Sequence, residues 1–493
     1  MRCSTLLGLV LAVTPVAAQT TPSASQAAAS ITATDVARRI GIIADDSMMG
    51  RDTPSRGLDL TAEYVADQFR RFGLKSSFQR YPITRRRLEP GRSRLIFAAG
   101  GRQDTANFST AARFGGGVVP GKPVRASAVL VGGPHTAESA ADVNVRDKVV
   151  LFVPPAKGDP AGYQQVLRVL FLGGSKALVI MDDADSATFA GSVPKRYPER
   201  TVVGMPAAQP VIVQLRSGAV KNALAAAGVD LNAARRAASP VSRELPSLQV
   251  AVDMADTVTS SLTAPNTIGI LEGSDPKLKN EYVVYSAHMD HIGITPGQAD
   301  SINNGADDDA SGTAGVVELA EAFSRPGARP KRSLIFLTVS GEEKGLWGSD
   351  YFARNPPVPV KQIVADINID MIGRNWADTI VAIGKEHSDL GATLERVSKA
   401  HPELRMNAID DRWPEERFYF RSDHYNFARK GVPVLFFFNG VHQDYHEVSD
   451  SPDKINSEKE ARILKLLYFL GQDVANAPKR PEWKPESYRE IVE

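Results

Sequence analysis

Residues 282–291 read YVVYSAHMDH, an apolar run that ends in two histidines and an aspartate. The apolar part, 282–286, has the aromatic and β-branched composition of a buried strand. A helical stretch with one apolar face follows at 314–323. Further strand candidates lie at 333–338, 363–369 and 433–438. This alternation of strands and helices predicts an α/β sheet covered by helices.

The segments before this half predict a second, smaller domain. An amphipathic helix carries Val65 and Phe69 on one face, and Gly73 stands where a helix would end. From about 115 to 255, short β-like runs alternate with helical stretches and many Pro and Gly residues. We therefore predict a main domain in two parts, 34–114 and 256–477, with an α+β domain at 115–255 inserted between them. The Pro-rich, charged tail at 478–493 is expected to be extended.

The first 18 residues have the three-part pattern of a secretory signal peptide. Arg2 precedes the apolar run 6–13, and Val16-Ala17-Ala18 follows it. The run is too short to span a bilayer, which takes ~20 apolar residues. We predict cleavage after Ala18, a linker at 19–33, and a secreted or periplasmic protein without an integral membrane segment.

Charge and cysteine content exclude several classes of function. The 493 residues include 58 Lys plus Arg and 57 Asp plus Glu, so the formal net charge of +1 gives no support for nucleic-acid or membrane-surface binding. The only cysteine, Cys3, lies in the predicted signal peptide. This excludes a cysteine nucleophile and thiolate metal sites from the mature chain. A serine hydrolase is disfavoured because no G-x-S-x-G elbow is present.

Five short segments hold a high density of metal-type ligands, and four of them directly follow a predicted strand. They are 288–291 (HMDH), 303–312 (NNGADDDASG), 340–343 (SGEE), 368–371 (NIDM) and 445–450 (YHEVSD). Taken singly, a histidine at a strand end or a Glu-Glu pair usually has a structural explanation. Their recurrence at successive strand ends predicts one shared site, because ligands bind at the carboxyl ends of strands in open α/β sheets. A calcium loop of the EF-hand type fails on spacing.

These segments resemble the M28 family of metallopeptidases, over roughly 34–110 and 256–475. The region between resembles, more weakly, the protease-associated domain inserted in many family members. The resemblance implies a mixed eight-stranded sheet flanked by helices, and two zinc ions for which cobalt or manganese can substitute. It also implies five metal ligands, with Asp308 shared between the two ions: His288, Asp308, Glu343, Asp370 and His446.

The resemblance implies roles for three further residues. Glu342 is expected to be the general base, Asp290 to orient the imidazole of His288, and Tyr445 to donate a hydrogen bond to the oxyanion. Two ions about 3.5–4 Å apart can share one water and lower its pKa, and Glu342 would take the proton of that water. His291 and His442 are expected beside the site rather than as ligands.

The implied activity is hydrolysis of peptide substrates, with an aminopeptidase as the leading hypothesis. The alternatives are a carboxypeptidase or dipeptidase of the same fold, a single-zinc glutaminyl cyclase, and a non-catalytic binding ectodomain. A carboxypeptidase needs basic groups for the terminal carboxylate. Four arginines lie in loops that could supply them: Arg374, Arg412, Arg417 and Arg421. The oligomeric state stays open, and so does the role of the Ser422-Asp423-His424 run, which matches a family pattern near the pocket.

Overall fold

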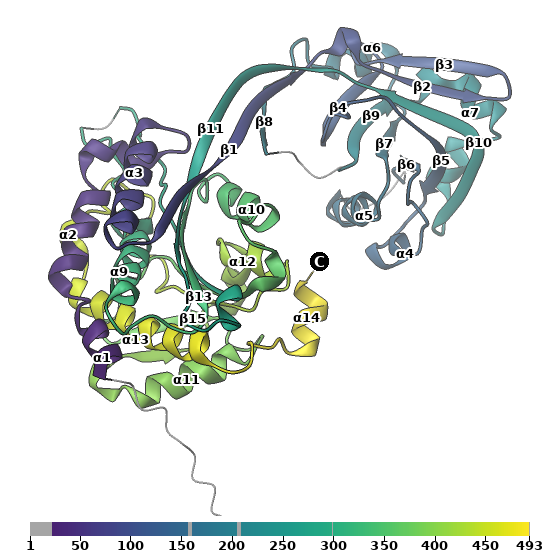
Figure 1. Cartoon of the computed structure of the whole chain (residues 1–493). Helices are drawn as coiled ribbons and strands as arrows, with labels where there is room; N and C mark the ends of the chain where they lie inside the picture. Colours follow the sequence, from purple (N-terminus) through teal and green to yellow (C-terminus); the bar gives the residue numbers. More distant parts are fainter. Residues whose placement is uncertain (1–21, 156–159, 205–208, 298, 493) are drawn as a thin grey trace, which may run out of the picture. The chain divides into compact units, whose positions relative to one another are not determined.

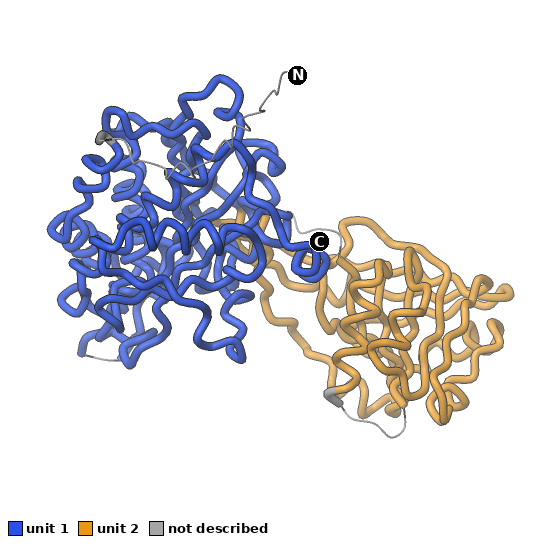
Figure 2. The backbone as a smooth tube through the Cα atoms, turned by 90° about the horizontal axis from the view of Figure 1, so that it is seen from below, with its two compact units in different colours: residues 1–81, 263–493 blue, residues 82–262 orange. Residues whose placement is uncertain are grey.

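A computed structural model describes residues 22–155, 160–204, 209–297 and 299–492. The predicted signal peptide and its cleavage site lie outside the described residues. No helix within them is both long and apolar enough to cross a membrane. The chain divides into two compact units, shown in blue and orange in Figure 2. Unit 1 comprises 1–81 and 263–493, and unit 2 comprises 82–262.

Unit 1 is built on a mixed sheet with the strand order β16-β15-β17-β14-β12-β13-β11-β1 (Figure 1). Strands β17, β14, β12 and β13 are parallel neighbours, while β11 and β15 run antiparallel to β13 and β17. The strands are β1 Lys75–Leu88, β11 Asp256–Leu271, β12 Tyr282–His288, β13 Ser333–Val339, β14 Ile363–Ile369, β15 Thr379–Ile383, β16 Asn407–Ile409 and β17 Val434–Phe437. This confirms the predicted α/β class with a mixed central sheet.

Both faces of this sheet are covered, because successive side chains of each central strand point to opposite sides. Tyr285 and Phe336 pack into one core, and Val284 and Ile335 pack into the other. The helices whose side chains join the first core are α1 Pro22–Ala29, α2 Ala33–Ile43, α3 Arg56–Arg71, α9 Gly312–Ser324, α11 Leu390–Ala400 and α13 Ser457–Asn476. Those of the second core are α10 Trp347–Arg354, α12 His424–Ala428 and α14 Pro485–Ile491.

The register of the parallel strands brings the predicted ligand segments to one edge of the sheet. His288, the last residue of β12, is paired with Val339 at the end of β13. Ile369, the last residue of β14, is paired with Phe437 at the end of β17. The loops that leave these four strand ends therefore start side by side, although more than 140 positions separate the first from the last, which ends at Phe437.

Unit 2 contains a second mixed sheet with the order β3-β2-β10-β5-β6-β7-β9-β4. Its strands are β2 Arg94–Ala99, β3 Arg102–Asn107, β4 Ala112–Gly117, β5 Val124–Gly132, β6 Val149–Val153, β7 Ala177–Asp182, β9 Val211–Arg216 and β10 Val241–Asp253. The helices of this unit are α4 Ala137–Ala141, α5 Pro160–Leu172, α6 Ser186–Ser192, α7 Lys221–Ala226 and α8 Leu231–Arg236. The short strand β8 Arg200–Val203 pairs antiparallel with residues 83–86 of β1 and is the last strand in the order of the first sheet.

Three local expectations differ from the structure. Unit 2 spans 82–262 rather than 115–255, because β2 and β3 complete its sheet through hydrogen bonds between β2 and β10. Part of the expected linker 19–33 forms α1, whose Ala27 and Ala28 are small enough to pack into the core of unit 1. The expected extended tail contains α14, anchored by the buried side chain of Ile491.

Candidate metal centre

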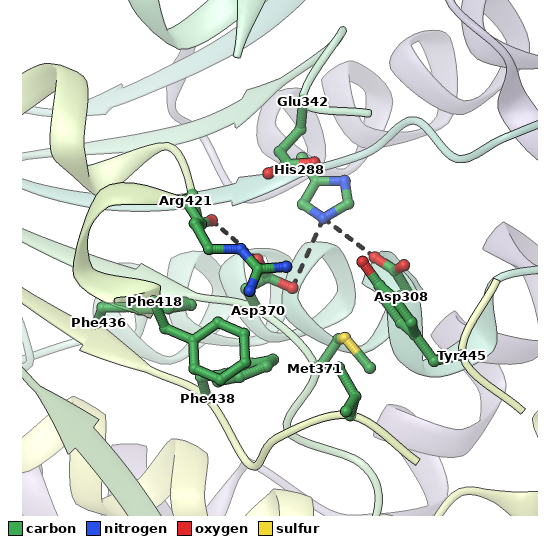
Figure 3. A pocket seen from close by; sticks show the side chains of 12 residues that line it. His288, Asp308, Glu342, Asp370, Met371, Phe418, Arg421, Phe436, Phe438 and Tyr445 are labelled. Carbon is green, nitrogen blue, oxygen red and sulfur yellow. Dashed lines mark hydrogen bonds and ion pairs between the residues drawn. The ribbon is translucent and has the colours of Figure 1, made fainter. Parts of the chain in front are cut away.

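The five predicted metal ligands converge at the carboxyl edge of the central strands of unit 1. His288 ends β12, Asp370 directly follows β14, and Glu343 lies in the turn after β13. Asp308 lies in the turn at 306–311 that leads into α9, and His446 lies in the loop after β17. Figure 3 shows His288, Asp308 and Asp370 turned toward one another, with Glu342 and Tyr445 close by.

A first group of donors surrounds the imidazole of His288. Its Nε2 lies 3.3 Å from Oδ1 of Asp308 and 3.6 Å from Oδ1 of Asp370. The hydroxyl of Ser422 donates a hydrogen bond of 2.8 Å to Oδ2 of Asp370. One oxygen of Asp370 is therefore held by the protein, while the other faces His288.

A second group forms on the other side of Asp308. Nε2 of His446 lies 3.2 Å from Oδ2 of Asp308 and 3.0 Å from Oε2 of Glu343. Nδ1 of His291 lies 2.8 Å from Oε1 of Glu343, so His291 donates to that carboxylate. Glu343 thus has the same arrangement as Asp370, with one oxygen held and the other turned toward the imidazole of His446.

The spacing of these donors suits the coordination of zinc. Two donors that bind one tetrahedral ion at about 2.0–2.2 Å lie roughly 3.3–3.6 Å apart. The separations in both groups are close to this range, and Asp308 offers a different oxygen to each group. Oδ2 of Asp308 and Nε2 of His446 are buried without a hydrogen-bond partner among the described residues, which a bound cation would satisfy. Imidazole and carboxylate donors without sulfur suit zinc and also admit cobalt or manganese.

The neighbouring Asp309 has a different task, although it lies within 4.8 Å of donors on His288 and Asp370. Its carboxylate accepts hydrogen bonds from the backbone amides of His288 (3.2 Å), Gly312 (2.8 Å) and Met371 (3.1 Å). Because these amides belong to the end of β12, the start of α9 and the loop after β14, Asp309 ties these three segments together. Asp308 keeps its carboxylate turned toward the two histidines.

The electrostatics favour positive charge between the ligands. Burial lowers the pKa of His446, but the carboxylates of Asp308 and Glu343 outweigh burial and raise it to about 10. Carboxylates that hold a proton on an imidazole this firmly can hold a divalent cation in the same place, with release of the proton. Burial raises the pKa of Glu342 well above its usual value, against the effect of His288, and Asp423 raises it further.

A cavity of about 400 Å³ opens beside the first group, and the predicted base and oxyanion donor line it. Glu342 and Tyr445 face this cavity together with the ligands of the first group (Figure 3). Burial, followed by the charges of Asp308 and Glu343, raises the pKa of Tyr445, so its phenol keeps the proton that a hydrogen-bond donor needs. The rest of the lining is largely apolar: Met371, Phe418, Phe436, Phe438 and Val441.

Asp290 contacts its neighbours differently from the expectation. Its Oδ1 lies 3.7 Å from Nδ1 of His288, whereas its backbone carbonyl oxygen lies 3.2 Å from that nitrogen. The imidazole is therefore oriented by donating from Nδ1 to the backbone carbonyl oxygen of Asp290. The carboxylate instead accepts hydrogen bonds from the hydroxyl of Thr53 (3.0 Å) and the amide of Glu342 (3.3 Å).

The remaining candidates separate into near and distant groups. His442 lies behind the turn at 306–311, with Nε2 3.2 Å from Oδ2 of Asp307. Of the four arginines expected near the pocket, Arg421 lines the cavity. Arg374 is paired with Asp444 at 2.8 Å. Arg412 packs on the ring of Trp376, and Arg417 packs on that of Phe420.

Two buried residues at the site were not recognised in the sequence. Arg51 and Thr53 contact the ligand-bearing loops. Their partners are 237 to 288 positions away along the chain. No periodicity or local motif marks such contacts, because they exist only in the folded chain.

Part of the chain is similar to known metallopeptidases. Residues 266–470 match the sequence model of Peptidase family M28. Leupeptin-inactivating enzyme 1 of Streptomyces exfoliatus is 32% identical over 204 residues, which cover 40% of each chain. A probable zinc metalloprotease of Pyricularia oryzae is 28% identical over 273 residues, covering 46% of this chain and 52% of that protein. The chain thus spans about half or less of the length of these curated relatives.

Among solved structures, an aminopeptidase from Aneurinibacillus sp. strain AM-1 aligns with 94% of this chain and 98% of its own, at 21% identity and a TM-score of 0.49.

Proposed function

We propose that this chain is a two-zinc aminopeptidase. The observation that carries the proposal is the position of Asp308, which turns one oxygen toward His288 and the other toward His446. A carboxylate shared in this way supports a pair of ions rather than a single one. The names of two relatives, a leupeptin-inactivating enzyme and a probable zinc metalloprotease, support zinc and a peptidase activity.

The residues around the donors have complementary tasks in peptide hydrolysis. Bound zinc would supply Lewis acidity, which polarises the substrate carbonyl and makes water more acidic. Glu342 accepts the proton of the attacking water and returns it to the leaving amine. The phenol of Tyr445 donates a hydrogen bond to the carbonyl oxygen as negative charge develops there.

The charges in the cavity favour a substrate with a free amino terminus. Of the three carboxylates that line the cavity, Asp308 and Asp370 are assigned to the ions, which leaves Glu342 to attract an ammonium group. The guanidinium of Arg421 lies 3.6 Å from a carboxylate oxygen of Glu416. The positive charge of Arg421 is therefore already paired within the protein. The apolar wall provides a place for an apolar side chain next to the scissile bond.

Arg421 also supports a second candidate, a carboxypeptidase, because it is a cation at the edge of the same cavity. A single-zinc cyclase would need only one of the two donor groups. A non-catalytic ectodomain would need neither donor group.

The test combines metal analysis with a matched substrate panel. We expect two zinc ions per chain and cleavage of leucine p-nitroanilide, but no cleavage of its N-acetyl counterpart. Cleavage of amino-blocked peptides from the carboxyl end would keep the chemistry and replace the aminopeptidase by the carboxypeptidase. One ion per chain, or two ions without hydrolysis of any peptide, would overturn the proposed function.

A further inference from the structure

The segment 50–53 contacts three loops that carry predicted ligands or the predicted base. It lies between α2 and α3, more than 200 positions before the segment 266–470 that matches the peptidase family. Its backbone has an unusual conformation, since Met49, Gly50 and Arg51 all have positive φ angles of 53°, 66° and 54°. Such a conformation costs energy in a residue with a side chain, so its contacts must stabilise it.

The backbone of this segment pairs with the loop that follows β12. The amide of Gly293 donates to the carbonyl oxygen of Gly50 at 3.0 Å, and the amide of His291 donates to that of Arg51 at 3.4 Å. A Cβ atom at Gly50 would lie 2.5 Å from the carbonyl oxygen of Gly293 and 2.7 Å from that of Asn303. Only glycine allows the segment to approach this closely.

Arg51 holds the two loops on either side of the first ligand group. Its guanidinium is fully buried and donates to the carbonyl oxygens of Met289 (2.9 Å) and Gly305 (2.8 Å). It also donates to the carbonyl oxygens of Asn304 and Ile43. Met289 follows His288 directly, and Gly305 precedes Asp308 by three residues. One side chain therefore connects the loop of His288 with the loop of Asp308.

Thr53 connects the loop of His288 with the loop of the predicted base. Its hydroxyl donates to Oδ2 of Asp290 at 3.0 Å and accepts from the amide of Gly341 at 3.1 Å. The amide of the next residue, Glu342, donates to Oδ1 of the same Asp290 at 3.3 Å. The hydroxyl group thus uses both its donor and its acceptor capacity between Asp290 and the start of the Glu342 loop.

We propose that residues 50–53 are a positioning clasp, in which the Thr53 hydroxyl fixes Asp290 and the backbone next to Glu342 while Arg51 joins the loops of His288 and Asp308. The clasp rests on the proposed function, because it acts on the ligands and the base assigned there. Its contacts are made entirely by the chain itself, so it sets the spacing of the donors before any cation enters. Groups that hold ligands in place in this way commonly change metal affinity or activity by about 10–100-fold.

The test compares Thr53→Val with Thr53→Ser and with a matched control. Thr53 is 3% exposed and Thr61, in α3, is 0% exposed. Among the described residues, the hydroxyl of Thr61 donates to the carbonyl oxygen of Gly57 in the preceding turn, at 3.1 Å. Thr61→Val therefore removes an equally buried hydroxyl without touching the ligand loops. Zinc affinity is measured by competition with a chromogenic chelator, and kcat and KM are measured separately at saturating zinc.

We expect Thr53→Val to lose about 10–100-fold in zinc affinity and in kcat, with little change in KM. Thr53→Ser keeps the hydroxyl, and its zinc affinity and kcat should be close to those of the unchanged protein. The same holds for Thr61→Val. If Thr53→Val gives no folded protein, Thr53→Ala carries the same comparison, because alanine also lacks the hydroxyl and is smaller than valine.

The clasp is overturned if Thr53→Val matches Thr61→Val in zinc affinity and kcat, or if Thr53→Ser is as impaired as Thr53→Val. These outcomes differ from failure of the proposed function, in which the unchanged protein itself would bind fewer than two zinc ions or hydrolyse no peptide.

Discussion

Replacing Glu342 by glutamine separates the predicted base from the predicted ligand beside it. Glutamine has nearly the same shape, but it cannot accept the proton of an attacking water. Glu342 lines the cavity, and its amide is held by Asp290 at 3.3 Å, so the glutamine side chain should occupy the same place. Glu342 belongs to neither donor group, whereas Glu343 lies 3.0 Å from His446.

The expected size of the effect follows from these roles. A general base contributes about 10²–10⁴-fold to the rate, which corresponds to roughly 3–5 kcal/mol in the activation barrier. Glu342→Gln should therefore lower kcat by about 10²–10⁴-fold and keep both zinc ions, with KM little changed. Glu343→Gln should instead lose zinc at the second group, because it removes one charged donor and leaves the neighbouring imidazole with fewer partners.

The assay is steady-state hydrolysis of leucine p-nitroanilide, with elemental analysis of zinc on the same protein samples. Two results would refute the reasoning. If Glu342→Gln kept kcat close to that of the unchanged protein, Glu342 would not be the base. If it lost zinc while Glu343→Gln kept it, the two roles would be exchanged.

Three further predictions concern the cavity and its loops. Tyr445→Phe removes the phenol donor and should lower kcat by about 10–10³-fold without loss of zinc, measured as for Glu342; an unchanged kcat would contradict the role. Phe418→Ala opens the apolar wall and should lower kcat/KM for leucine and phenylalanine substrates more than for an alanine substrate, which a panel of p-nitroanilides tests. Lys454, Ser449 and Arg374 hold the pKa of Asp444 well below its usual range. The contribution of Asp444 to stability is thus complete above about pH 4 and lost as pH falls through the lowered pKa. Asp444→Asn should lower the thermal unfolding midpoint at pH 7, and the difference in midpoint between the variant and the unchanged protein should shrink in acid. An equal difference in midpoint at pH 7 and pH 3 would contradict this role of Asp444.

Local sequence patterns predicted the elements of the main sheet well. The apolar runs at 282–286, 333–338 and 363–369 correspond to β12, β13 and β14, each longer than or equal to the run that predicted it. The amphipathic helix with Val65 and Phe69 is α3, and Gly73, with φ of 81°, follows its end. These predictions succeeded because periodicity and glycine conformation are properties of neighbouring residues.

Local patterns failed where distant partners decide the structure. Ser457 and Glu460 have the sequence spacing of a capping box, but the side chain of Asn456 caps α13 by accepting from the amide of Lys459. Glu460 is instead buried inside unit 1. Similarly, the small side chains of α1 suggested a linker, and only the core of unit 1 reveals why they pack there.

By itself, the sequence determined which residue types could form the site and that they follow successive strands. It did so because strand ends and ligand motifs are written within a few neighbouring residues, as in His288-Met289-Asp290 or Glu342-Glu343. Only the tertiary structure decided how Asp308 divides its two oxygens between the histidines, and that the backbone of Asp290 rather than its carboxylate lies nearest to the imidazole. It also decided that Thr53 reaches Asp290 and Gly341. These contacts join residues far apart in the chain, and their geometry is set by packing and strand register, which no local pattern encodes.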